Sequence, residues 1–86
     1  MGNFTHIIIF GNNAEGADII AWNKASEEIK KYNMETVYWG APLGVSENRV
    51  LIIKGPMSGY SEMIGKSNWP IGKVMTNTRS VVCWTP

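Results

Sequence analysis

The stretch that decides the fold is His6-Ile7-Ile8-Ile9-Phe10, and two later stretches share its pattern, Val50-Leu51-Ile52-Ile53 and Val81-Val82-Cys83-Trp84. A strand with one face in water alternates apolar and polar side chains, whereas these three are apolar at consecutive positions. Both faces of the sheet that they form must therefore be covered. The remaining sequence offers helices for one face only, so the pattern predicts that a partner covers the other.

Length and composition restrict the class of protein. Eighty-six residues fit one domain, spanning 1–86, and a chain of this size buries only roughly 60–65% of its unfolded surface. The net charge of +1 gives no electrostatic footprint for nucleic acid or an anionic membrane. No run reaches the length of a membrane span, and the N-terminus lacks the pattern of a signal peptide. We expect a cytoplasmic protein that binds neither nucleic acid nor membrane.

Turn residues and apolar periodicity divide the chain into six elements. Strands are predicted over 4–10, 35–41, 49–54 and 73–84, and helices over 15–32 and 58–66. Asn13 and Ser58 are the expected N-caps of the two helices. The first helix has one apolar stripe, formed by Trp22, Ala25, Ile29 and Tyr32. The order βαββαβ predicts a ferredoxin-like α+β fold, in which a four-stranded antiparallel sheet carries both helices on one face.

Alternation along each strand divides the apolar residues between the two faces of this sheet. In the second strand it assigns Val37 and Trp39 to one face and Thr36 and Tyr38 to the other. One face packs under the helices, and the other would be a larger exposed apolar patch than monomers usually tolerate. Packing on the same face of a second copy removes it from water through a two-fold interface. Burying roughly 500 Å² per protomer would contribute on the order of 12 kcal/mol before association costs.

The chain resembles the dimeric α+β barrel superfamily, whose ferredoxin-like protomers stack sheet to sheet. The resemblance covers essentially the whole chain and rests on element order and on three segments, Thr5-His6-Ile7-Ile8-Ile9-Phe10, Thr36-Val37-Tyr38-Trp39-Gly40 and Gly72-Lys73-Val74-Met75-Thr76-Asn77-Thr78. The last two look like small GYD-type proteins, and the first looks like stress-responsive barrel domains. The resemblance implies a homodimer, or a higher oligomer, with an apolar pocket between the sheet and the helices of each protomer. The superfamily includes antibiotic-biosynthesis-type monooxygenases, isomerases and cyclases that need no cofactor, but the His-Pro-x-His segment of some cyclases is absent here.

His6, the single histidine, is the first candidate for catalysis. Its side chain titrates near neutral pH and could act as a general acid or base, with Tyr38 assisting. The alternative is a core or interface histidine with a satisfied hydrogen bond. Cys83 lies in an apolar strand and is expected to be a buried, inert thiol.

Aromatic and polar side chains supply the candidates for ligand binding. Trp22, Trp39 and Tyr60 could line a pocket for a planar molecule, although aromatics at these spacings are also typical of a core. Asn77 and Arg79 lie in a polar stretch of the last strand and could orient an anionic or carbonyl-bearing ligand, or simply form a solvated rim. No cluster of ligands suggests a metal, and no motif suggests a cofactor.

Two functions remain open from the sequence. The first is a small homodimeric module, without catalysis, that binds a small apolar or aromatic molecule. The alternative is a cofactor-independent monooxygenase, isomerase or cyclase-type enzyme that uses His6 as its acid or base.

Overall fold

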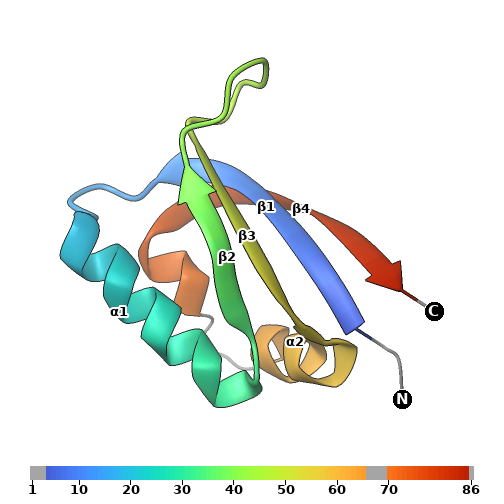
Figure 1. Cartoon of the computed structure of the whole chain (residues 1–86). Helices are drawn as coiled ribbons and strands as arrows, with labels where there is room; N and C mark the ends of the chain where they lie inside the picture. Colours follow the sequence, from blue (N-terminus) through green and yellow to red (C-terminus); the bar gives the residue numbers. More distant parts are fainter. Residues whose placement is uncertain (1–3, 66–69, 86) are drawn as a thin grey trace.

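The computed structural model describes residues 4–65 and 70–85. Its elements follow the predicted βαββαβ order (Figure 1). The strands are β1 (Phe4–Asn13), β2 (Glu35–Gly40), β3 (Arg49–Pro56) and β4 (Met75–Thr85). The helices are α1 (Ile19–Ile29) and α2 (Met57–Ile64), and two 3-10 turns follow them, η1 (Lys30–Tyr32) and η2 (Pro70–Lys73). The expected end of the second helix at residue 66 lies outside the described residues.

The four strands form one antiparallel sheet in the order β2-β3-β1-β4. The two strands that are central in this order, β1 and β3, carry two of the three doubly apolar stretches. β2 and β3 form a hairpin, while α1 and α2 each lie in a crossover between strands (Figure 1). The predicted fold class is therefore confirmed.

The core lies between the helices and one face of the sheet. Ile7 and Ile9 of β1 and Ile53 of β3 are fully buried there. Both helices contribute to the same cluster, α1 through Trp22, Ala25 and Ile29 and α2 through Met63. Because one cluster joins both helices to this face, it is called the helix face below, and its opposite is called the outward face.

Neither helix begins at its predicted cap: α1 begins later than a cap at Asn13 would place it, and α2 begins earlier than a cap at Ser58 would place it. Asp18 caps α1, since its Oδ1 accepts a hydrogen bond from the Ala21 amide at 3.0 Å. Asn13 instead ends β1, which runs past its expected end at Phe10. The side-chain amide of Asn13 donates to the carbonyls of Ala14 and Ala17. Pro56, and not Ser58, occupies the N-cap of α2.

Extra residues interrupt the register on both edge strands. In β2, Thr36 pairs with Ile53 and Tyr38 with Ile52, so Val37 is the additional residue of a bulge. The predicted assignment of Thr36 and Tyr38 to one face is therefore wrong. Thr36 lies on the helix face, where its hydroxyl donates to Ser26 of α1 at 2.9 Å, and Tyr38 lies on the outward face. In β4 a similar irregularity places Asn77 in the left-handed region, at φ 52°.

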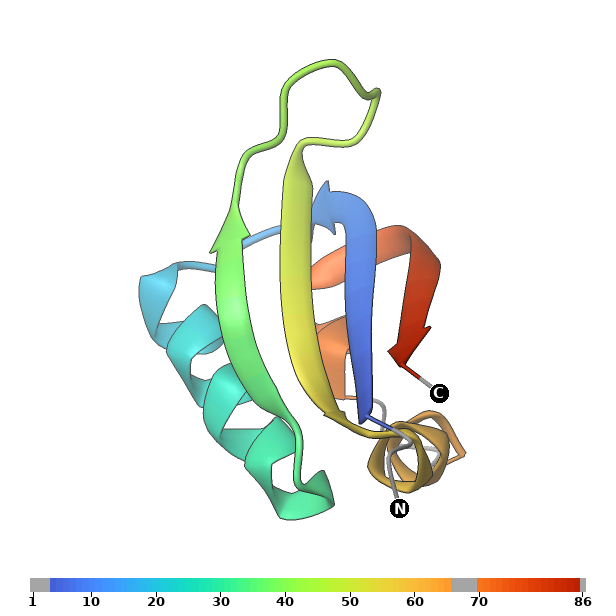
Figure 2. The same ribbon diagram turned by 45° about the vertical axis from the view of Figure 1, so that its right-hand side comes forward.

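The second half of β4 is exposed on both faces. Figure 2 shows α2 at the lower end of the sheet, where it packs on β3 and η1, while β4 runs along the edge. As a result Val82 and Trp84, which the register places on the helix face, remain 43% and 53% exposed. Cys83 is also exposed, so the expectation of a buried thiol is wrong. Cys83 pairs with His6 of β1 on the outward face, which carries no helix.

The loop between β2 and β3, residues 41–48, projects beyond the end of the sheet as an arm (Figures 1 and 2). Its base is held by two hydrogen bonds to β1. The Asn13 amide donates to Oδ1 of Asn48 at 2.9 Å, and the Asn48 amide donates to Oδ1 of Asn12 at 3.3 Å. Leu43, farther along the arm, is almost fully exposed. The arm is thus tied to β1 at Asn48, while Leu43 near its tip is exposed to solvent.

Candidate functional site

The outward face is organised in rows that run across the four strands. Since Ile7, Ile9, Leu51 and Ile53 point toward the helices, their neighbours along each strand point away. The strand register then defines the central row, which consists of Tyr38, Ile52, Ile8 and Val81. Tyr38 is 55% exposed and Val81 is 45% exposed. An apolar band therefore crosses the whole sheet on the side that carries no helix.

One end of the outward face carries an ion pair between Arg79 and Glu47. Arg79 lies opposite Phe10, with its guanidinium carbon 4.5 Å from the centre of the Phe10 ring. The same guanidinium donates to both carboxylate oxygens of Glu47 in the arm, at 2.6 and 3.3 Å. This hydrogen bond holds the pKa of Glu47 below its usual value of 4.5, and the pKa of Arg79 is raised by the same contact. The positive charge of Arg79 is thus already matched by Glu47 and stacked on an aromatic ring.

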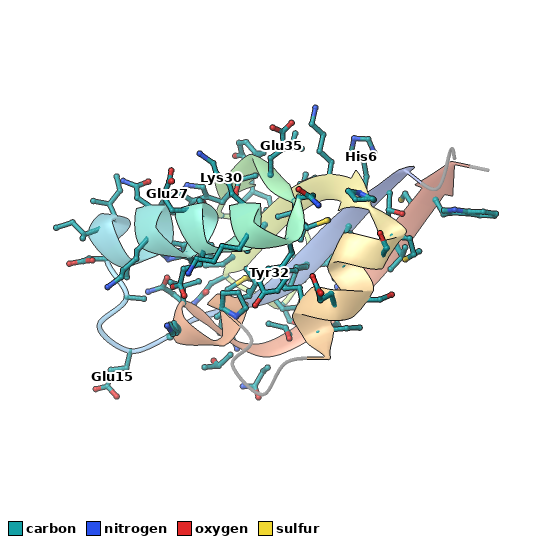
Figure 3. The ribbon with its side chains drawn as sticks, turned by 90° about the horizontal axis from the view of Figure 1, so that it is seen from below. His6, Glu15, Glu27, Lys30, Tyr32 and Glu35 are labelled. Carbon is teal, nitrogen blue, oxygen red and sulfur yellow. The ribbon has the colours of Figure 1, made fainter. Side chains whose placement is uncertain are left out.

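The other end of the outward face carries a polar row, defined by Glu35, Lys54, His6 and Cys83. Lys54 and Glu35 form an ion pair at 3.0 Å. Figure 3 shows His6, Glu35 and Lys30 pointing to the same side of the molecule. His6 itself is exposed. Here an imidazole, an ammonium and a thiol lie on neighbouring strands.

A hollow of about 260 Å³ lies beside this polar row. It is lined by Lys30, Asn33, Met34, Glu35, Lys54 and Gly55. Met34 is fully buried and supplies an apolar wall, while the two lysines and Glu35 supply charges. Gly55 is needed at this point, because a Cβ there would lie 2.5 Å from the Met34 sulfur and 2.6 Å from the Asn33 carbonyl oxygen. The close approach of β3 to the turn before β2 thus shapes the hollow.

The structure brings His6 and Tyr38 onto one face but does not make them neighbours. His6 belongs to the polar row and Tyr38 to the central row, and β3 separates their strands. Two strand spacings correspond to about 10 Å. A molecule that touches both side chains would have to span β3 on the outward face.

The predicted aromatic residues lie elsewhere. Trp22 is 2% exposed, stacks on Trp39 at 4.7 Å between ring centroids, and donates its indole N–H to Asn13 Oδ1 at 2.8 Å. Tyr60 packs partly buried against the same core. These three residues therefore share the helix face, whereas Arg79 lies on the outward face and Asn77 lies at the bulge of β4. The predicted ligand-binding residues do not form a single cluster.

Three residues of the polar end escaped the sequence analysis, namely Lys30, Glu35 and Lys54. Each is a charged residue at the end of an apolar segment, which is typical of any solvated end of a helix or strand. Only the pairing of Glu35 with Lys54, and of Lys54 with His6, places Glu35 and Lys54 in one row, while Lys30 joins them at the hollow. A register shared by three strands is not visible in a single sequence, although the end positions of Glu35 and Lys54 in adjacent hairpin strands hint at the first pairing.

Two further findings concern the described residues alone. Within residues 4–65 and 70–85, no three His, Cys, Asp or Glu side chains come together as a metal-binding group. In the same part of the chain, no helix has the length and apolar character that a membrane crossing requires.

Comparison with known proteins gives matches in structure and none in sequence. No protein-family model matches the chain, and no curated protein does. A dimeric ferredoxin-like protein of unknown function from Thermobifida fusca YX superimposes with a TM-score of 0.54 at 10% identity, over 98% of this chain and 92% of that chain. The methylated RPA0582 protein superimposes with a TM-score of 0.56 at 13% identity, over 98% of this chain and 82% of that chain. At these identities the likeness establishes the fold, and this chain has the ferredoxin-like fold.

Proposed function

We propose that this protein is a homodimer, joined through its outward sheet faces, that binds a small apolar or aromatic molecule. The observation that carries the proposal is the central row of the outward face, an apolar band that the protomer leaves open to water. Two copies related by a two-fold axis would each cover the band of the other. The Thermobifida fusca protein that shares the fold is dimeric, which supports self-association.

The ligand is proposed to lie on the outward face. The alternative location, between sheet and helices, is occupied by the stacked rings of Trp22 and Trp39 and by the buried aliphatic core around them. On the outward face of the single protomer, by contrast, Tyr38 and Val81 keep about half of their surface accessible. A planar apolar molecule between the two facing sheets would cover part of that surface.

The dimer is tested by two substitutions at adjacent positions of β4. Val81 and Val82 have nearly equal exposure, 45% and 43%, but the register places them on opposite faces. Light scattering should give twice the chain mass of 9.6 kDa for the parent and for Val82→Lys. Val81→Lys should give the chain mass, because its ammonium would be buried without a partner at the interface. A monomeric parent, or equal dimerisation of the two variants, would contradict the proposed interface.

A second candidate function is a cofactor-independent enzyme of the monooxygenase, isomerase or cyclase type. It is favoured by one observation, namely that His6 and Tyr38 share the outward face. In this proposal His6 transfers the proton and Tyr38 orients the substrate. Turnover of planar phenols by the parent, and its loss in His6→Ala at equal folded fraction, would support an enzyme. Absence of turnover in the parent, or equal rates in the two proteins, would leave the binding function.

A further inference from the structure

The two ends of the outward face differ in the availability of their positive charge. At one end, Arg79 donates to both oxygens of Glu47 and stacks on Phe10. At the other end, Lys54 has a single ion-pair contact with Glu35, and the two side chains are 38% and 59% exposed. Because exposed ion pairs of this kind are weak, a second carboxylate could share or replace Glu35 at little cost. Of the two cations, Lys54 is therefore the one that an anionic ligand could bind more readily.

The surroundings of Lys54 combine a polar and an apolar environment. On one side it lines the hollow of about 260 Å³, whose wall also includes Lys30 and the buried Met34. Along its own strand, two residues away and on the same face, lies Ile52 of the apolar central row. An ammonium at the border of an apolar band matches a molecule that has an anionic group at one end and an apolar body at the other.

From this arrangement we infer that the ligand of the outward face is a small aromatic carboxylate. Its ring would lie on Ile52 and Ile8, and its carboxylate would bind Lys54 at the hollow, with His6 beside it in the row. The inference rests on the proposed function, since it assigns a chemical class to the same ligand. It adds that charge, and not apolar contact alone, selects the molecule.

Glu35 has a defined part in this inference. Its carboxylate is the existing partner of Lys54, so it competes with an incoming carboxylate for the same ammonium. Removing its charge should strengthen the binding of an anion. Removing the charge of Lys54 should weaken the binding of an anion and leave a neutral molecule of the same shape unaffected.

The test uses benzoate and its neutral isostere benzamide as probes, with isothermal titration calorimetry on the full chain. The parent should bind benzoate at least about tenfold more tightly than benzamide. Lys54→Met should reduce benzoate affinity to that of benzamide, and Glu35→Gln should raise it several-fold. Lys73→Met is the matched control, because Lys73 also forms an exposed ion pair, at 3.3 Å to Glu28, but lies away from the hollow. That variant should bind both probes as the parent does.

The outcomes separate this inference from the function on which it rests. Equal affinity of the parent for benzoate and benzamide would overturn the carboxylate inference while leaving a binding site for aromatic molecules. Unchanged benzoate affinity in Lys54→Met, or an equal loss in Lys73→Met, would overturn the assignment to Lys54. If the parent binds neither probe, the carboxylate inference fails, and the Val81→Lys comparison still decides whether the outward face is the dimer interface.

Discussion

Replacing Trp22 with alanine should remove a large part of the stability of the domain. The indole is almost fully buried, stacks on Trp39, and donates a hydrogen bond to Asn13. Truncating a buried tryptophan costs about 3–5 kcal/mol, and the lost stack and the orphaned acceptor of Asn13 favour the upper end of that range. Domains of 86 residues have a total unfolding free energy of about 4–13 kcal/mol.

The assay is urea denaturation followed by far-UV circular dichroism, at one fixed protein concentration because dimerisation makes stability depend on concentration. Trp22→Phe should lose about 1–2 kcal/mol, since it keeps an aromatic ring against Trp39 but loses the N–H donor to Asn13. Trp84→Ala is the control, because Trp84 is 53% exposed, and its loss should be below about 1 kcal/mol.

A loss in Trp22→Ala that is no larger than the small loss expected in Trp84→Ala, below about 1 kcal/mol, would refute the reasoning. The Trp22 ring would then be dispensable for folding, as expected for the wall of an open pocket. The sequence left both interpretations of Trp22 and Trp39 open, so this comparison also decides between core and ligand-binding roles for the stacked pair.

Three further predictions concern local contacts. Asp18→Ala should lower the unfolding free energy by about 0.5–2 kcal/mol in urea denaturation, because the amide of Ala21 loses its hydrogen-bond acceptor. An unfolding free energy equal to that of the parent would contradict the assignment of Asp18 as the cap. Gly55→Ala should lower the urea midpoint, because its methyl group would overlap the chain before β2, and an unchanged midpoint would show that this chain moves freely. The pKa of Glu47 is lowered by its contact with Arg79, so its ionised form stabilises the fold above its unfolded pKa. That contribution is lost as the pH falls through the lower folded value. Thermal unfolding of Glu47→Gln should therefore differ from the parent at pH 7 and converge with it in acid, and a pH-independent difference would exclude the linkage.

The fold was largely predictable because its determinants are local patterns. The consecutive apolar residues at 6–10 and 50–53 became the two central strands, and the stripe of Trp22, Ala25 and Ile29 became the buried side of α1. The helix boundaries were less predictable. Asn13 and Asp18 are both good capping residues, and the choice between them depends on the extension of β1 into contact with β4.

The arrangement of the candidate site was less predictable, because it depends on register. One additional residue in β2, Val37, reverses the face of every following side chain, so that Tyr38 points outward and Trp39 points inward onto Trp22. Strict alternation could not anticipate this. Similarly, the row that joins Glu35, Lys54 and His6 comes from residues far apart in the chain, and no local pattern marks it.

The fixed base of the arm has a consequence for protein engineering. Asn48 ties the arm to β1, and Glu47 ties it to Arg79 of β4, so the end of the loop that enters β3 is held by contacts that the tip does not share. Foreign peptides inserted beside Leu43, at the exposed tip, would extend into solvent while the hairpin keeps its register. The 41–48 loop is thus the natural position on this scaffold for displaying an epitope or a fluorescent reporter.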